Sequence, residues 1–172
     1  FDSRYSLDAE LSATNLMFFD VQQHKTALNL NLSRQWNHHI STSLFTEFSL
    51  NRVSSEVYDE LYLGPESYTI AQAGFSMVFD YRDHPLIPTR GWVGSIEVAG
   101  GVENESGIQF VRTEAAFAYY RPLSKKWRTS FAARTIAITG TESLNETPFG
   151  LRVFNGGSTS VRSFPEYELG LY

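Results

Sequence analysis

An alternation of apolar and polar side chains with a period of two residues limits this chain to a small set of folds. In residues 27–33 every second side chain is leucine, and the side chains between the leucines are Asn or Ser. The same alternation recurs in residues 40–50, 69–81, 109–120 and 127–137. Successive side chains of a β-strand point to opposite faces, so each segment predicts a strand with one apolar and one polar face.

About seven strands are predicted in this way, and most of them are long. They cover residues 4–13, 23–35, 38–52, 68–81, 91–101, 108–121 and 126–139. Strands of soluble proteins average about 5–6 residues, whereas a tilted strand needs about 9–11 residues to cross a membrane. The lengths therefore favour an all-β fold, an antiparallel transmembrane β-barrel, over a soluble β-sandwich that acts as a binding module.

The connections between the predicted strands agree with a membrane barrel. Residues 36–37 and 122–125 are short, and the Pro-rich segment 82–90 is compact. Residues 53–67 and the stretch from 140 onward are long and polar. Membrane barrels have short periplasmic turns and longer external loops, so we expect the stretch from 140 onward to lie on the external side.

Composition removes several classes of function. The chain has no Cys, which excludes disulfides and thiolate metal sites. Its net charge of −5, with no basic patch to offset it, argues against nucleic acid as a partner. The four histidines are not spaced as joint metal ligands, and no cofactor site is indicated. No apolar run approaches the roughly 18 residues of a membrane helix.

Charged residues on the polar strand faces predict a network that lines the barrel lumen. No His or Ser is patterned with them as acid–base catalysis would require, so we expect no enzyme. The residues of this expected network are Glu47, Glu97, Arg112, Glu114, Arg128 and Arg134.

A proline-rich segment between two predicted strands reads as a rigid turn. Its sequence is Asp80-Tyr81-Arg82-Asp83-His84-Pro85-Leu86-Ile87-Pro88-Thr89-Arg90-Gly91-Trp92. Pro85 and Pro88 fix φ and end strand pairing, and Gly91 permits a backbone conformation that other residues resist. The segment resembles the D-x-R-x-x-P-x-x-P-x-x-G turn of the BamA/TamA outer-membrane assembly superfamily, with Asp80 and Arg82 at its first two positions.

A second segment resembles the G-G-x-x-x-V-R-G-F/Y signature of the same superfamily. The matching residues are Gly156, Gly157, Val161, Arg162 and Phe164. The resemblance implies a long sixth external loop that folds into the lumen, where Arg162 pairs with acidic residues of the inner wall. Ser163 stands where glycine is usual, and its β-carbon restricts φ at the tip of this loop.

The resemblance also implies a place in a larger protein. Residues 1–172 would be part of one sixteen-stranded outer-membrane barrel, about strands five to eleven with the sixth loop. We expect the soluble POTRA domains and the remaining strands to belong to a longer chain, because this one starts at Phe1 without Met. The implied location is the bacterial outer membrane, and an organellar outer membrane is the less favoured alternative.

The function implied by the resemblance is assembly, insertion or translocation of other proteins. Its partners would be outer-membrane lipids, unfolded outer-membrane or secreted client proteins and accessory assembly proteins. Three alternatives stay open: a two-partner secretion transporter, the membrane barrel of a fused enzyme, and a plain porin. A transporter would carry a plug helix upstream, a fused enzyme would carry a hydrolase domain there, and a porin would lack the arginine loop.

Overall fold

Seven antiparallel strands form one sheet in which each strand pairs with its neighbours in sequence. The computed structural model describes residues 4–18, 20–58, 63–140, 147–155 and 169–170. The strands are β1 (Tyr5–Phe18), β2 (Val21–Gln35), β3 (Ile40–Ser55), β4 (Ser67–Asp80), β5 (Gly91–Glu103), β6 (Gln109–Pro122) and β7 (Arg128–Thr139). All seven predicted strands are therefore present.

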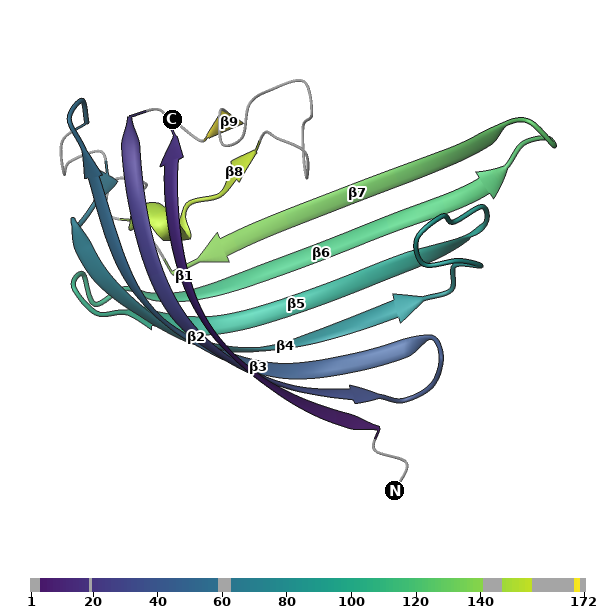
Figure 1. Ribbon diagram of the computed structural model, residues 1–172, viewed down its shortest axis with the longest axis horizontal. Coiled ribbons are helices and arrows are strands. Elements are labelled where there is room, and N and C mark those ends of the chain that lie inside the picture. The colour runs from purple at the N-terminus through teal and green to yellow at the C-terminus, as the bar shows by residue number, and fades with distance from the viewer. Residues whose placement is uncertain (1–3, 19, 59–62, 141–146, 156–168, 171–172) are drawn as a thin grey trace.

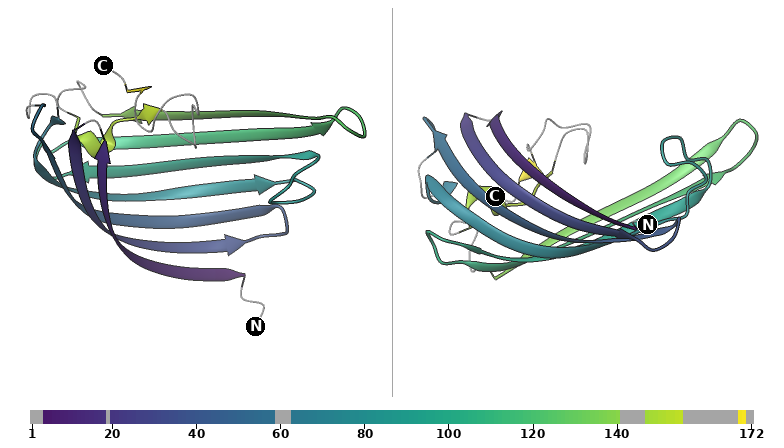
Figure 2. Two further views of the ribbon diagram at one scale, coloured as in Figure 1. Left: turned by 45° about the horizontal axis from the view of Figure 1, so that its top comes forward. Right: turned by 60° about the horizontal axis from the view of Figure 1, so that its bottom comes forward.

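The sheet is curved, and the short 3-10 helix η1 (Phe149–Leu151) and the strand β8 (Phe154–Asn155) lie on its concave side (Figures 1 and 2). The strand β8 pairs with β9 (Leu169–Gly170). No helix among the residues described has the length and apolar character needed to cross a membrane. Within the described sheet, β1 and β7 each pair on one side only.

The strand register assigns each side chain to the convex or the concave face. Leu30 pairs with Thr46, Thr46 with Ala73, and Ala73 with Gly100, so these residues share the convex face. Large apolar side chains on this face are exposed: Leu7, Leu11, Leu28, Leu30, Leu32, Leu44, Phe48, Leu50, Phe75, Ile96, Val98, Val102, Val111, Phe117, Tyr119 and Phe131. A soluble protein would bury such a continuous surface, whereas a barrel wall presents it to lipid.

The connections gather at two ends of the sheet. At one end, here called the loop end, β1 connects to β2, β3 to β4 and β5 to β6, and residues 147–152 lie there as well. At the other, here called the turn end, lie residues 36–39, 81–90 and 123–127 (Figure 1). The expected difference in length is only partly present, because β1 ends at Phe18 and β2 begins at Val21, so the connection between them at the loop end is very short.

Along β1 to β3 the polarity of the two faces reverses at the loop end. There the concave face is apolar and buried, with residues such as Val21 and Val53, while Arg52 lies on the convex face. This reversal explains why the sequence reading ended the first strand at residue 13. Asn15 turns outward and Leu16 inward, so the apolar pattern changes face although the strand continues to Phe18. The loop-end parts of β1 to β3 therefore extend beyond the lipid-facing apolar band.

Candidate functional site

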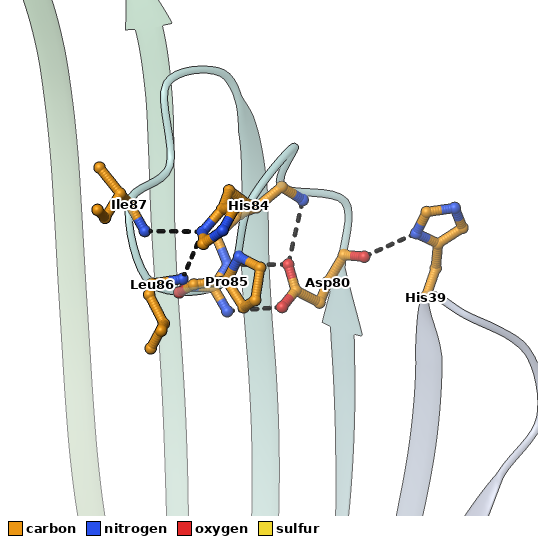
Figure 3. A network of polar contacts seen from close by, with 7 residues as sticks. His39, Asp80, His84, Pro85, Leu86 and Ile87 are labelled. Carbon is orange, nitrogen blue, oxygen red and sulfur yellow. Dashed lines mark hydrogen bonds and ion pairs between the residues drawn. The ribbon is translucent and has the colours of Figure 1, made fainter.

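Asp80 and Arg82, the first two fixed positions of the proline-rich motif, close the turn 81–90 on itself. Figure 3 shows Asp80 at the end of β4 beside Pro85 of the turn. The carboxylate of Asp80 accepts hydrogen bonds from Arg82, with Nε 2.8 Å from Oδ1 and Nη2 2.6 Å from Oδ2. Nη1 of Arg82 donates to the carbonyl oxygen of Pro85 at 2.9 Å. Paired charge-assisted bonds of this kind fix orientation as well as distance, so the arginine ties the turn to the end of β4.

The next two residues of the turn satisfy backbone groups further along it. Oδ1 of Asp83 accepts the N–H groups of Thr89 at 2.9 Å and of Arg90 at 3.1 Å, and Oδ2 accepts the Thr89 hydroxyl. Nδ1 of His84 accepts the N–H groups of Leu86 at 3.2 Å and of Ile87 at 3.1 Å. Hydrogen bonds from the Thr89 side chain and then from the two backbone N–H groups hold the pKa of Asp83 far below its usual value.

Gly91 ends the turn in a conformation that a side chain would prevent. Its φ is +100°, and a β-carbon built there would lie 2.1 Å from the carbonyl oxygen of Tyr81. The clash is with backbone, so no side-chain rotation relieves it. Pro88, the second proline of the motif, is half-buried in the same turn. The turn role that the sequence predicts for these two residues fits this geometry.

A row of rings borders the turn on the convex side. The rings of His39 and Tyr81 stack at 4.5 Å, those of Tyr81 and Trp92 at 4.8 Å, and Trp92 lies 6.0 Å from Phe117. His39 also joins the turn between β2 and β3 to β4, because its Nδ1 lies 2.8 Å from the carbonyl oxygen of Asp80. Aromatic rows of this kind mark the interface of a membrane barrel with water.

Ion pairs line the concave face, but they form two groups rather than one network. Arg112 lies 2.9 Å from Glu114 and 3.7 Å from Glu97, and Arg134 lies 2.8 Å from Glu114. Glu47 belongs to a separate pair, in which its Oε1 lies 2.8 Å from Nζ of Lys25. Arg128 was expected in the network and makes no ion pair with the described residues. It pairs in register with Pro122 at the turn end, far along β7 from Arg134.

Residues 149–151, beyond β7, pack against the concave face at the loop end. The backbone N–H of Gly150 donates to the hydroxyl of Tyr68 at 2.8 Å. A buried apolar cluster surrounds this bond and joins the segment to the sheet: Val21, Val53, Leu63, Tyr68, Ile70, Phe110, Phe149 and Leu151. Residues 149–151 are thus held on the concave face of the sheet.

Glu103 is a structural carboxylate that the sequence reading did not single out. It is 1% exposed, and its two oxygens accept the N–H groups of Glu105 at 2.6 Å and of Ser106 at 2.8 Å. The predicted strand ended at residue 101, although the alternation along β5 continues to Glu103 and assigns it to the concave face. Counting that alternation further would have identified it.

The arginine-loop motif lies outside the described residues. Gly156, Gly157, Val161, Arg162 and Phe164 all fall in this part of the chain. The predicted pairing of Arg162 with the inner wall therefore stays a prediction.

Comparison with known protein families identifies the family to which this sheet belongs. The sequence profile of the Omp85 superfamily domain matches residues 1–172. The chain belongs to the Omp85 superfamily. The Omp85 chain also resembles a solved structure described as the crystal structure of BamA from Haemophilus ducreyi lacking POTRA domains 1-3, with a TM-score of 0.72 and 14% sequence identity. No curated protein sequence matches it significantly.

The structural likeness to BamA covers nearly all of this chain but only part of the BamA chain. It covers 97% of this Omp85 chain and 35% of the BamA chain, so the present chain spans about a third of that protein's length. At this identity the likeness shows the fold, an antiparallel β-barrel wall. Membership of the Omp85 superfamily places the wall in an outer membrane, within a group of barrels for protein assembly and translocation.

Proposed function

We propose that this barrel segment belongs to a bacterial outer-membrane factor that inserts or translocates other proteins. The observation that carries the proposal is the superfamily match across the whole chain. The partners would be unfolded outer-membrane or secreted client proteins and accessory assembly proteins, in a bilayer whose lipids contact the convex face. The work is conformational and involves no covalent chemistry, catalytic residue or cofactor.

The concave face has properties that suit such a role. Ion pairs between Arg112, Glu114 and Arg134 give it a polar surface that a polypeptide in transit can cross without losing all of its hydrogen-bonding partners. The segment 147–152 narrows the interior at the loop end, where it is held by apolar packing and by Tyr68. A narrowed interior supports a factor that handles protein clients more than an open diffusion pore.

We propose further that Arg162 braces the lumen by pairing with acidic residues of the wall. In the full-length protein, Arg162→Ala is expected to slow client assembly and to raise pore conductance, while the barrel still folds. Arg128→Ala is the matched control, because Arg128 is also on the concave face of the sheet and makes no ion pair with the described residues. Unchanged conductance and client assembly in Arg162→Ala would remove this role.

Depletion of the full-length protein tests the function itself. An assembly factor predicts that several unrelated outer-membrane β-barrel proteins fall together in quantitative proteomics of the membrane fraction. A two-partner transporter predicts the loss of one secreted protein from the medium, and a porin predicts slower uptake of small solutes with neither change. Normal levels of all other outer-membrane and secreted proteins after depletion would contradict the proposal.

A further inference from the structure

Arg34 has an unusual setting at the turn end of the sheet. Its guanidinium carbon lies 3.6 Å from the ring centroid of Trp36 and 5.0 Å from that of Tyr5. The Trp36 ring is itself held, because its Nε1 donates to the hydroxyl of Thr42 at 2.9 Å. Stacking on aromatic faces fixes the plane of a guanidinium and leaves its edge directed away from the rings.

Among the residues that the structure describes, this cation has no anionic partner. Its Nε is buried without a hydrogen-bond partner, and Arg34 forms no ion pair with any residue that the structure describes. Because Nε is buried, the terminal nitrogens Nη1 and Nη2 are the donors that an anion can reach, and an anion bound there would balance the charge of the guanidinium. The two rings remain open on their outer sides, with Tyr5 56% and Trp36 47% exposed.

The register places this group on the lipid-facing side of the wall. Arg34 is two residues from Leu32 on β2 and pairs with Tyr5 and Thr42, so it shares the convex face with the exposed leucines. It lies at the turn end, where the apolar band finishes among aromatic rings. At this depth a basic side chain meets the headgroup layer of a bilayer rather than its acyl chains.

The distribution of charge between the two ends indicates the chemistry of that layer. Bases prevail around the turn end: Arg4, Arg34, Arg82, Arg90, Arg121, Lys125, Lys126 and Arg128, against Asp80 and Asp83. Acids outnumber bases around the described part of the loop end: Asp20, Glu56, Glu66, Glu103 and Glu105, against Arg52, Arg112 and Arg152. The turn end therefore attracts anions and the described part of the loop end does not.

We propose that Arg34, stacked against Tyr5 and Trp36, binds the phosphate of an anionic phospholipid headgroup in the leaflet at the turn end. The guanidinium edge supplies parallel N–H donors that match two phosphate oxygens, and the rings contact the glycerol and the upper acyl chain. The source of the phosphate is a lipid rather than a free anion, because the site opens onto the surface that the apolar band places against the bilayer.

Native mass spectrometry of the full-length protein with added phosphatidylglycerol or phosphatidylcholine tests the site. The wild-type protein is expected to bind phosphatidylglycerol more tightly, and Arg34→Gln to lower that affinity about tenfold, the effect of one charge-assisted contact. Arg121→Gln is the matched control, since Arg121 is on the same face and end without ring contacts. Arg52→Gln, on the same face at the loop end, is the second control.

Folding and ligand source are controlled separately. Each variant is first checked for heat-modifiable migration in gels, and Trp36→Leu gives a second variant that removes the stacking surface but keeps the charge. Trp36→Leu is expected to lower phosphatidylglycerol affinity as well. The proposal is overturned if Arg34→Gln and Trp36→Leu bind like the wild type, if Arg121→Gln loses equal affinity, or if inorganic phosphate displaces the lipid at equal concentration.

Discussion

At the scale of single residues, Gly91 is the position where the turn 81–90 leaves least room for change. Gly91→Ala is expected to destabilise the full-length barrel by about 2 kcal/mol or more, because a positive φ and a backbone clash add together. The clash is the 2.1 Å approach of a β-carbon to the carbonyl oxygen of Tyr81. Urea titration of folding into vesicles measures the change. Gly100→Ala is the control, because a β-carbon there meets nothing within 4 Å, and equal losses for both variants would contradict the prediction.

Asp83 gives the turn a defined dependence on pH. Its pKa is lowered in the folded protein, first by the Thr89 hydroxyl and then by backbone N–H groups. Its contribution is therefore complete above the ordinary Asp pKa of about 3.9 and is lost as pH falls below that value. Hydrogen exchange of residues 81–90, corrected for intrinsic rates, should show steady protection from pH 7 to 5 and weaker protection at pH 3.

Asp83→Asn separates this effect from general acid unfolding. The amide oxygen can still accept the N–H groups of Thr89 and Arg90, and it does not titrate. We expect this variant to lose the pH dependence of protection in the turn while the strands behave as in the wild type. The same decline in both proteins would mean that Asp83 does not control the order of the turn.

The residue scale also shows what sequence can and cannot predict. The spacing of Asp80, Arg82, Pro85 and Gly91 was enough to predict a rigid turn. It did not reveal that Arg82 reaches the carbonyl of Pro85, because that contact depends on the path of the turn. Arg34 was not singled out at all, since its two stacking partners come from separate parts of the chain, Tyr5 across the β1–β2 pairing and Trp36 beyond the end of β2.

At the scale of elements, the contact between η1 and β4 tests whether the inner segment is held in place. Tyr68→Phe keeps the packing and removes the acceptor of the Gly150 N–H. The loss of one such bond costs about 1 kcal/mol, so exchange of residues 147–152 is expected to rise about fivefold. Tyr119→Phe, on the convex face, is the control. Unchanged exchange in Tyr68→Phe would show that packing alone holds the segment.

The sequence predicted strand boundaries accurately only where every outward side chain was apolar and every inward side chain was polar. In the apolar band, outward side chains meet lipid, and alternation predicted β2 to β7 to within about three residues. Beyond the band, outward side chains meet water and inward ones pack against the segment after β7. The pattern therefore changes face near Asn15, and β1 was predicted five residues too short. A prediction that allowed this change of face would have recovered the full strand.

At the scale of the whole molecule, the sequence predicted the barrel because lipid imposes one condition on every strand. An unpaired backbone group in the bilayer costs several kcal/mol, so strands long enough to cross must pair into a closed wall. The inner arrangement was less predictable, because an ion pair such as Lys25 with Glu47 depends on the register between two strands. The register depends on all the strands of the sheet together. The alternation of side chains within one strand therefore does not predict it.

Two adjacent residues of β2 test the orientation of the entire wall. Leu30 is on the convex face and exposed, whereas Asn31 is on the concave face and pairs in register with Asp8. A charged residue facing lipid near the bilayer midplane costs about 2–4 kcal/mol, and one facing the lumen costs little. Leu30→Arg is therefore expected to reduce the free energy of folding into vesicles by this amount, measured by urea titration of the full-length protein.

Asn31→Arg is the matched partner of that variant, because it adds the same side chain one residue away on the same strand. It is expected to fold with nearly wild-type stability, since the new guanidinium lies beside the carboxylate of Asp8 on a polar surface. Because both variants add arginine to the same part of β2, they differ mainly in which face of the sheet carries the new side chain. A larger loss for Asn31→Arg than for Leu30→Arg would mean that the convex face does not meet lipid, and the membrane assignment of every strand would fail with it.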